Sequence, residues 1–575
     1  MAVAGWTRGV AASAAKAVHT VRCFNAAPRC MSTVAKPESK AEVPLDFGDF
    51  KAAYKVSEPD KTLGQLTLAL AVLQFSSFPG VARYGEALLA GRTAHAPLFG
   101  RCPLLWLSQK TFFAHFCAGE DQKGIAPRIA ELRASGVGSI LDYAAEEDVP
   151  EESMRDLGVS EDKLQSRTYA YVGEEACDEN LDITLSSIRA AASLEGKAGF
   201  AAVKVTSLGV PQALQHLSQV LMDIRAAFLR VAGGAKAAEG VDLESFVVSL
   251  PLHSATLDKE AFVKGVQLSG MSMDEAEAEA LFHDIDADGT GTIDFVEWLD
   301  YCNPRILGGM QAENVPSSIL PPGRPTKLTP ELQRSLDAML KRAERLAQAA
   351  DEAGVTIMFD AEQTYMQPAI DHIVWYLQRQ YNIERPVVFN TYQAYLKDCP
   401  DRMSLALDKA RKHGYKFGAK LVRGAYRVQE AKRAEDGGYP NPIQPNIQAT
   451  HDAYDWCLRR VMESIADGSG ARVMVASHNE ASIQRAVDMM GELGISRKDN
   501  AVFFGQLLGM CDHVSFTLGA KGFAVYKYVP YGPVGKTIPY LIRRAQENGD
   551  LLAGAARERK LLRSAILHRL APNQR

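Results

Sequence analysis

Several patterns that would place a chain in a specialised class are missing from these 575 residues. There is no uninterrupted apolar run of about 18 residues, which a membrane-spanning helix needs. There is no C-x-x-C motif, and the nine cysteines are an odd, dispersed set, which indicates reduced thiols in an intracellular compartment. No basic run is interleaved with aromatic residues and the net charge is -5, so nucleic-acid binding is not expected.

Acidic residues are absent from residues 1–37, and the first one is Glu38. Five basic residues interrupt this Ala- and Ser-containing segment, so it lacks the continuous apolar core of a secretory signal. The composition is typical of a mitochondrial transit peptide; a disordered tail is the alternative. In the following segment, 38–118, the most apolar pieces predict a helical arm, and a peripheral membrane contact is a second reading of the same pieces.

A repeated strand–helix pattern covers most of the remaining chain. Eight short apolar runs are each followed by a helical stretch, which predicts a parallel sheet with helical crossovers. Eight units favour an α/β fold of the closed (β/α)8 type; an open doubly wound sheet is the alternative, but no G-x-G-x-x-G follows the first run. The runs are 139–143, 201–206, 356–360, 387–391, 418–423, 472–476, 501–504 and 523–527.

The expected barrel is divided in the sequence. Its first part spans 119–232, an insert with a proline-rich linker spans 233–330, and its second part spans 331–575. Chemistry in such barrels lies at the carboxyl ends of the strands, and polar residues are expected there. They form a ring rich in positive charge, which favours an anionic substrate or cofactor: Lys204, Asp360, Asn390, Gln393, Lys420, Arg423, Ser477, His478, Asn479 and Tyr528.

Within the insert, "DADGTGTIDFVE" (286–297) fits the twelve-residue calcium loop of an EF-hand. Gly291 stands at the sharp turn, and helical stretches flank the loop. The neighbouring segment with Leu257 resembles a partner hand that has lost its acidic ligands. We therefore expect one Ca²⁺ site, or an EF-hand pair kept only for packing. The expected ligands are Asp286, Asp288, Thr290, Thr292, Asp294 and Glu297.

Near the end of the chain, "IPYLIRRAQEN" (538–548) places two arginines side by side. On a helix, Tyr540, Arg543, Arg544 and Glu547 have the spacing i, i+3, i+4, i+7 and share one face. Paired guanidinium groups match a carboxylate bidentately. A surface salt-bridged pair is the alternative.

Five motifs together identify a resemblance. The strings "FDAEQTYMQPAID", "VVFNTYQAYLKDCP", "KLVRGAY", "ASHNEASI" and "YKYVPYGPVGKTIPYLIRRAQENG" resemble the proline dehydrogenase family of eukaryotic mitochondria, from about residue 119 to 568. The resemblance implies a barrel that binds FAD. It also implies oxidation of L-proline to Δ1-pyrroline-5-carboxylate by hydride transfer to the flavin, and electron transfer to ubiquinone on the matrix side of the inner mitochondrial membrane.

The same resemblance assigns residue roles. Arg543 and Arg544 hold the substrate carboxylate, with Lys204, Asp360, Tyr528 and Tyr540 completing the catalytic group. The expected cofactor-binding residues are Asp360, Ala361, Asn390, Gln393, Lys420, Arg423, Gly424, Ala425, Ser477, His478, Asn479 and Glu547.

Two positions bear on the activity. Bacterial members carry Arg where this chain has Lys420 and Lys where it has Arg423, so the charge is kept but the contact geometry differs. The hydroxyproline branch of the family carries serine at the position of Tyr528, and a phenol there would crowd a 4-hydroxyl group. We therefore expect proline to be the better substrate. The alternatives are a hydroxyproline dehydrogenase, or a calcium-sensing barrel without catalytic activity.

Overall fold

The computed structural model describes most of the chain in nine stretches, and every structural statement below concerns them. They are residues 45–49, 61–76, 103–144, 173–196, 199–233, 252–268, 273–302, 329–550 and 552–570, and side chains are not described at 103–105, 545–550 and 552–555. The predicted transit peptide at 1–37 and the linker before residue 329 lie outside these stretches.

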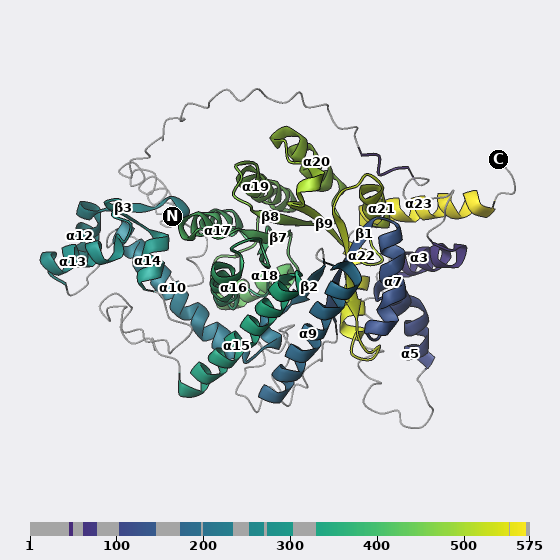
Figure 1. Ribbon diagram of the computed structural model, residues 1–575, viewed down its shortest axis with the longest axis horizontal. Helices are drawn as coiled ribbons and strands as arrows, with labels where there is room; N and C mark the ends of the chain where they lie inside the picture. The colour runs from purple at the N-terminus through teal and green to yellow at the C-terminus, as the bar shows by residue number, and fades with distance from the viewer. Residues whose placement is uncertain are drawn as a thin grey trace, which may run out of the picture. The chain divides into compact units, whose positions relative to one another are not determined.

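Eight parallel strands close into a barrel, in the spatial order β1-β2-β5-β6-β7-β8-β9-β10 with β10 returning to β1 (Figure 1). The predicted α/β barrel is therefore confirmed, and the open sheet is excluded because β1 and β10 pair over seven residues, Val137–Tyr143 with Val525–Tyr531. The strands are β1 (Val137–Tyr143), β2 (Phe200–Val203), β5 (Thr356–Phe359), β6 (Val388–Gln393), β7 (Gly418–Val422), β8 (Arg472–Ala476), β9 (Val502–Leu507) and β10 (Val525–Tyr531).

Two strand boundaries differ from prediction. β2 ends at Val203, so Lys204 lies one residue beyond the strand, at the start of a short 3-10 turn. Conversely, Tyr528 lies inside β10 rather than after it. The strand is longer than its apolar core suggested because it continues to pair with β1 as far as Tyr531.

Helices surround the barrel, and local sequence explains their ends. α15 begins after Thr329, whose hydroxyl accepts a hydrogen bond from the Leu332 amide, and has proline in its first turn. It ends at Gly354, which adopts the left-handed conformation with φ 71°. The helices of the barrel are α7 (Gln122–Ala134), α9 (Glu174–Glu195), α10 (Pro211–Gly233), α15 (Pro330–Ala353), α16 (Gln367–Tyr381), α17 (Cys399–His413), α18 (Arg427–Gly437), α19 (Ile447–Ala466), α20 (Glu480–Leu493) and α21 (Asp512–Ala520).

The described part of the insert between α10 and α15 contains three helices, and a short antiparallel ribbon joins the segment before the first helix to the loop before the third. Leu257 of β3 (Thr256–Asp258) pairs with Ile293 of β4 (Thr292–Asp294). Trp298 is fully buried, and its indole donates to the carbonyl of Ile224 on α10 at 3.0 Å. These contacts hold the insert against the barrel wall. Its helices are α12 (Lys259–Leu268), α13 (Glu275–Ile285) and α14 (Phe295–Tyr301).

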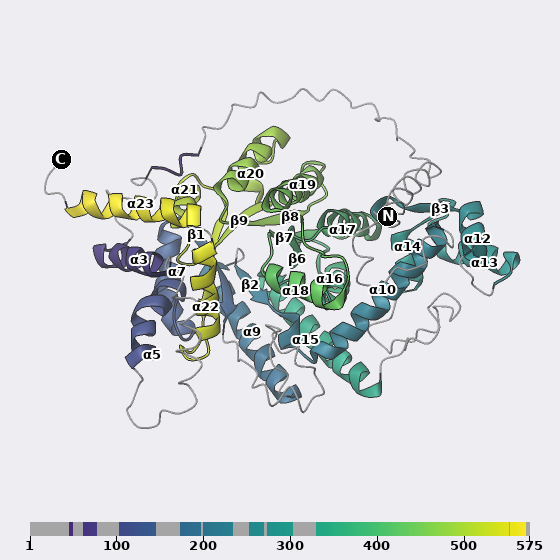
Figure 2. The ribbon, with the colours of Figure 1, turned by 180° about the vertical axis from the view of Figure 1, so that it is seen from behind.

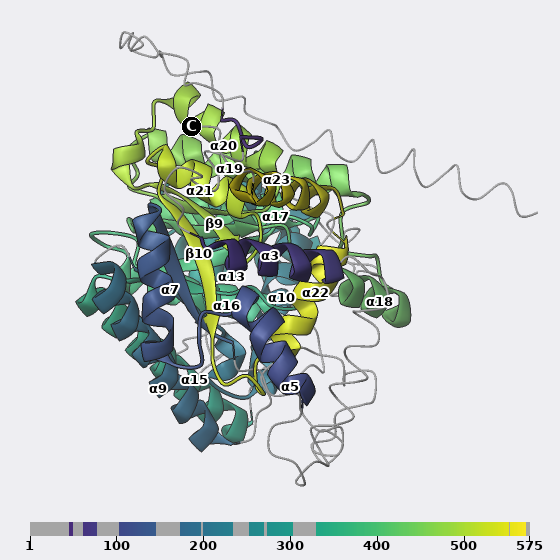
Figure 3. The ribbon, with the colours of Figure 1, turned by 90° about the vertical axis from the view of Figure 1, so that its right-hand side faces the viewer.

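An N-terminal arm packs against the two last helices. α3 (Leu63–Ser76) lies beside α23 (Leu552–Leu570), with Leu66 and Leu73 packed on Leu562 (Figures 1 and 2). α3 also lies beside α22 (Ile538–Asp550), as Figure 3 shows from the side, and its Val72 joins the apolar cluster that contains Tyr540. The arm thereby supports the helix that carries the paired arginines. None of the helices in the described stretches is long and apolar enough to cross a membrane.

Candidate active site at the carboxyl end of the barrel

The barrel interior changes from apolar to polar along the strands. Side chains alternate across a strand, so every second residue points inward. Phe200, Met358, Phe389, Met474 and Phe503 form one buried interior cluster, to which Tyr526 also belongs. On three of these strands a polar side chain follows two residues further along, where the alternation returns to the interior: Asp360 after Met358, Thr391 after Phe389 and Tyr528 after Tyr526. The apolar layer therefore closes the barrel beneath a polar floor.

Asp360 is the centre of the polar floor. It follows β5, and its carboxylate pairs with the ammonium group of Lys420 on β7, which is not an adjacent strand. The phenol of Tyr528 on β10 donates to the other carboxylate oxygen at 3.2 Å. The Lys420 ammonium also lies 5.7 Å from the centre of the Tyr528 ring. Three predicted residues from three strands thus meet in one hydrogen-bonded group.

The phenol of Tyr528 stays neutral. Burial raises the pKa of Tyr528 well above its ordinary value, and the neighbouring carboxyl groups of Asp142 and Asp360 raise it further. Tyr540 of α22 contributes to the same pKa shift, so its phenol lies near that of Tyr528. Both tyrosines can donate a hydrogen bond or pack against a ring, and the Tyr528 phenol does not act as a base near neutral pH.

Glu362 belongs to this group although the sequence analysis assigned it no role. It lies in the loop after β5, where the hydroxyl and the amide of Thr206 donate to its carboxylate at 2.9 and 3.2 Å. Burial raises the pKa of Glu362 to about 7, and the Lys204 ammonium opposes this shift. Gln393 donates to the Glu362 carbonyl at 2.9 Å. The position of Glu362 in "FDAE", two residues after Asp360, was the available signal.

Arg423 organises a second polar group between β7, β8 and the outer helices. Its guanidinium donates to Ser477 at 2.7 Å, to His451 at 3.0 Å and to Ser482 at 2.9 Å. The guanidinium carbon stands 4.5 Å from the centre of the Tyr454 ring. His451 and Ser482 were not predicted, since nothing in their local sequence places them beside Arg423, which lies 28 and 59 residues earlier.

Ser477, His478 and Asn479 have separate partners. The side-chain oxygen of Asn479 caps α20 by accepting from the Ser482 backbone amide at 3.0 Å. The backbone amide of Asn479 donates to the Ser477 hydroxyl at 3.0 Å. His478 is partly buried and accepts from the Leu507 amide at 3.0 Å. Burial, with the charges of Lys527 and Arg544, lowers the pKa of His478 to about 3. His478 is therefore neutral near pH 7.

Gly424 lies where no other residue fits. Its φ is 131°, and a Cβ atom there would stand 1.4 Å from the ring of buried Tyr395. The following Ala425 is exposed, and Ala361, between Asp360 and Glu362, is partly buried. Because Gly424 has no side chain, a ligand can approach the backbone closely at this corner of the barrel mouth.

Asn390 does not join the polar floor. Its neighbour Phe389 points into the barrel, so Asn390 points outward. Its amide donates to Asp371 on α16 at 2.9 Å. The side chain of Asn390 therefore lies toward α16 rather than in the polar floor.

The paired arginines lie on α22, directly after β10, as the spacing predicted. Arg544 is buried, with its guanidinium carbon 4.8 Å from the centre of the Tyr540 ring, and that of Arg543 is 6.0 Å from the same centre. Both guanidinium groups thus share one face with Tyr540. Glu547 continues the helix, but its side chain is among those not described.

Comparison with known proteins decides the family. A family model described as "Proline dehydrogenase" matches residues 125–555. The chain belongs to the proline dehydrogenase family. It is accordingly an oxidoreductase of the proline dehydrogenase type.

Three matches show the range of similarity to known proteins. The chain is 38% identical over 559 residues to "Proline dehydrogenase 1, mitochondrial" of Homo sapiens, covering 92% of this chain and 90% of that protein. It is 48% identical over 237 residues to "Hydroxyproline dehydrogenase" of Xenopus laevis, covering 41% and 51%. A crystal structure of proline utilization A from Bdellovibrio bacteriovorus, inactivated by N-propargylglycine, aligns with a TM-score of 0.46 at 16% identity, covering 92% of this chain and 41% of that one.

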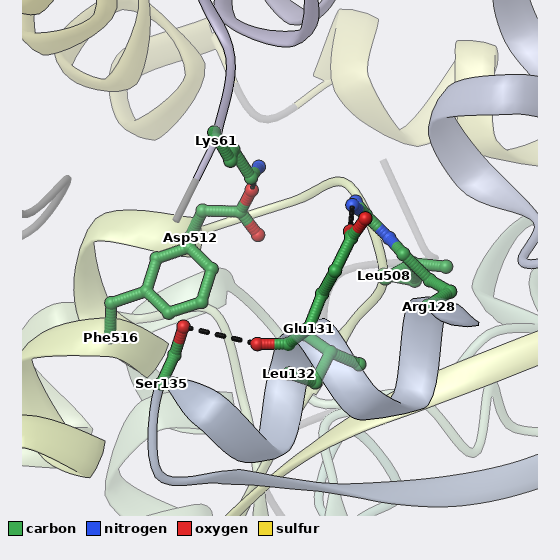
Figure 4. Close-up of a pocket in the computed structure, with 8 residues that line it drawn as sticks. All are labelled: Lys61, Arg128, Glu131, Leu132, Ser135, Leu508, Asp512 and Phe516. Atoms are coloured by element: carbon green, nitrogen blue, oxygen red, sulfur yellow. Dashed lines mark hydrogen bonds and ion pairs between the residues drawn. The ribbon is translucent and has the colours of Figure 1, made fainter. Parts of the chain in front are cut away.

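A small pocket lies outside the barrel wall of this proline dehydrogenase, away from Asp360. Figure 4 shows it between α7, α21 and the segment before α3, with Lys61 paired to Asp512 and Arg128 to Glu131. None of its lining residues belongs to the polar floor. It is therefore not a candidate substrate site.

The acidic loop of the insert forms a compact oxygen cluster. Carboxylate oxygens of Asp286, Asp288 and Glu297 all lie within 4.8 Å of one another. The loop is closed by backbone hydrogen bonds, with the amides of Thr290 and Gly291 each donating to Asp286 at 3.0 Å. The other predicted ligands lie in the same loop, where the Thr290 hydroxyl donates to the Thr292 carbonyl at 3.1 Å and Asp294 caps α14.

Proposed function

We propose that this chain oxidises L-proline to Δ1-pyrroline-5-carboxylate with FAD as its resident electron acceptor. The observation that carries the proposal is the position of two guanidinium groups on the helix that follows β10, beside Tyr540, next to a polar floor centred on Asp360. A proline carboxylate and a flavin are the two ligands that such a mouth suits.

The residues at the mouth fit the flavin cofactor. Both polar atoms of the buried Gln363 amide, which follows β5, have no hydrogen-bond partner among the described residues. Buried polar groups without partners are rare, so they indicate a missing ligand. Bound FAD supplies the two-electron acceptor of the reaction. Ser477, Arg423 and the backbone at Gly424 would hold its phosphates, and Lys420 and Gln393 its ring.

The substrate groups act by position. Arg543 and Arg544 hold the carboxylate through charge-assisted hydrogen bonds, which fixes the orientation of the pyrrolidine ring. Tyr528 and Tyr540 pack on that ring and exclude water. Asp360 keeps Lys420 and Tyr528 in place, and Lys204 adds positive charge. No strong base is needed, because the amine loses its proton to solvent before binding.

The decisive experiment is substrate saturation in a double variant, R543M/R544M. We expect the KM for L-proline to rise at least about 100-fold, since two charge-assisted hydrogen-bonding groups are lost. The flavin absorption band must be retained, which separates substrate binding from cofactor loss. Unchanged saturation by L-proline would reject the assignment, and a purified protein without a flavin band would favour the non-catalytic, calcium-sensing barrel.

Hydroxyproline is the second candidate substrate, because the local identity to the Xenopus laevis enzyme reaches 48%. Tyr528 argues against it. A phenol fixed by Asp360 at 3.2 Å cannot easily move aside for a 4-hydroxyl group. We therefore propose L-proline as the preferred substrate, and a higher kcat/KM for trans-4-hydroxy-L-proline would reverse this order.

We further propose that the enzyme works at the matrix face of the inner mitochondrial membrane and passes electrons to ubiquinone. Support comes from the basic, acid-free residues 1–37 and from the mitochondrial relatives. Large apolar side chains are exposed on the arm and the last helix, namely Phe75, Trp106, Leu107, Leu567 and Leu570. Flotation with vesicles of inner-membrane composition tests the contact: W106S/L107S should stay with the soluble fraction.

We also propose that the insert is an EF-hand pair whose second loop binds one Ca²⁺. The support is the oxygen cluster and the ribbon pairing of Leu257 with Ile293. Hard oxygen ligands suit Ca²⁺, and Thr290 is a weaker ligand than Asp, which lowers the affinity. E297Q should abolish calcium binding measured by calorimetry. The same proposal divides the chain at 233 and 330, with the arm at 38–118 and the barrel on either side of the insert.

A further inference from the structure

A lysine of the barrel occupies the acidic loop of the insert. Lys412 lies in the last turn of α17, and its ammonium nitrogen stands 3.1 Å from Asp288, 3.0 Å from Asp294 and 3.1 Å from Glu297. These three carboxylates are the third, ninth and twelfth positions of the loop. One side chain from outside the insert thus stands where the proposed metal would be held.

The buried carboxylate explains why a cation is needed there. The Glu297 side chain is only 4% exposed, and a buried carboxylate without a counter-charge is costly. Ca²⁺ binds oxygen ligands at roughly 2.3–2.6 Å and would draw on the same oxygens. An ammonium group at about 3 Å from three of them and a divalent cation cannot both be accommodated.

We propose that Lys412 is a tethered counter-cation of the acidic loop, and that Ca²⁺ binds by expelling it. The proposal depends on the calcium site proposed above and goes beyond it by coupling that site to α17. The loop is folded around the lysine, so it needs no metal to form. The apparent affinity for Ca²⁺ is then the affinity of the open loop multiplied by the fraction of molecules in which Lys412 does not fill the loop.

The insert does not leave the barrel when the lysine is expelled. Independent contacts hold α14: His413 lies 3.1 Å from Asp300, and the ring centres of Phe228 and Phe295 are 5.4 Å apart. The exchange is therefore local. Calcium should release the Lys412 side chain to solvent while the insert and the barrel stay packed together.

The first test measures Ca²⁺ affinity by calorimetry on the full-length, FAD-loaded enzyme. A loop filled by Lys412 for nine-tenths of the time binds metal about tenfold more weakly than an open one, so K412M should bind at least about tenfold more tightly. R411M is the matched control. Arg411 is the preceding residue, its side chain is 74% exposed and it pairs with Asp408 at 2.7 Å, so its loss removes the same charge outside the loop.

We expect R411M to bind Ca²⁺ within about twofold of the unmodified enzyme, because an exposed charge is screened by salt. If K412M gains no more affinity than R411M, the tether is refuted while the calcium site stands. If neither the unmodified enzyme nor K412M binds Ca²⁺, both proposals fall. Proline oxidation is measured in parallel, so failure of the calcium site is not confused with failure of the enzyme.

A second test needs no variant. Amine-reactive labelling of the unmodified enzyme, read by mass spectrometry, should show Lys412 protected without Ca²⁺ and at least about fivefold more reactive with it. Lys259 serves as the internal reference, because it lies in the insert and pairs with Glu279 at 2.8 Å, away from the loop. Equal labelling of Lys412 with and without Ca²⁺ would overturn the proposal.

Discussion

At the scale of single residues, Tyr528 connects the polar floor with substrate choice. Its ring faces the barrel mouth from β10 and its hydroxyl is held by Asp360. The ring excludes volume and the hydroxyl makes a hydrogen bond, and these two contributions can be separated by substitution.

We predict that Y528S raises the ratio of kcat/KM for trans-4-hydroxy-L-proline to that for L-proline by at least about tenfold, since a hydroxyl group gains room. Y528F is the control, because it keeps the ring and loses only the bond to Asp360. Steady-state kinetics with both substrates is the measurement. A ratio that shifts equally in the two variants would assign the effect to the hydrogen bond.

Gly424 is constrained by backbone conformation and by contact at once. We predict that G424A destabilises the enzyme by about 3 kcal/mol, combining strain at φ 131° with a clash against Tyr395. G438A is the control. Gly438 has φ 69° with nothing within 4 Å of a Cβ atom, so its cost should be about 1 kcal/mol. Thermal unfolding measures the stability lost in each variant. Equal losses would show that the contact with Tyr395 adds nothing to the cost at Gly424.

At the scale of elements, one buried histidine joins three helices. His513 of α21 lies 2.9 Å from Glu480 of α20 and 4.0 Å from Glu558 of α23. Burial opposes the charged imidazole, but the two carboxylates outweigh it and raise the pKa of His513 to about 9. The ion group therefore fastens the C-terminal helix to the barrel while the histidine is charged.

The sign of this pKa shift predicts a pH dependence. Because the pKa of His513 is raised on folding, charged His513 stabilises the folded state. This stabilisation is fully present below the ordinary histidine pKa of about 6.5 and is lost as pH rises through about 9. The contribution is at most about 3 kcal/mol. Melting temperatures between pH 6.5 and 9.5 should fall in the unmodified enzyme and fall less in H513Q. Parallel pH profiles would show that His513 is not the group responsible.

At the scale of the whole molecule, residues far apart in sequence build the wall behind the arginines. α3, near the start of the described chain, packs on α23 through Leu66 and Leu562 and on α22 through the cluster with Tyr540. The arm thus links the two last helices and stiffens the one that carries Arg543 and Arg544.

We predict that L562A lowers the free energy of unfolding by about 2–4 kcal/mol and raises the KM for proline at temperatures where the enzyme stays folded. Leu562 is buried against α3, so its loss loosens the support of α22. L377A is the matched control, since Leu377 is equally buried on α16. L377A should lower the free energy of unfolding by a similar amount without raising the KM. Equal KM values in the two variants would show that the arm does not support α22.

Much of this architecture follows from local sequence. Buried parallel strands are short apolar runs and their crossovers are helical, so eight units could be counted and a closed barrel predicted. The helical spacing of Tyr540, Arg543 and Arg544 likewise predicted a shared face, because that geometry repeats every 3.6 residues. The acidic loop could be predicted because its proposed ligands stand at fixed offsets within twelve residues of sequence.

Other features depend on tertiary contacts and are absent from any local pattern. Asp360 meets Lys420 only because barrel closure brings non-adjacent strands to one mouth. Asn390 points outward because its neighbour Phe389 takes the inward position on the strand. Lys412 reaches the loop from more than a hundred residues away. Periodicity and spacing are local quantities that the chain determines by itself, whereas the partner of a charged side chain is decided by packing between distant elements.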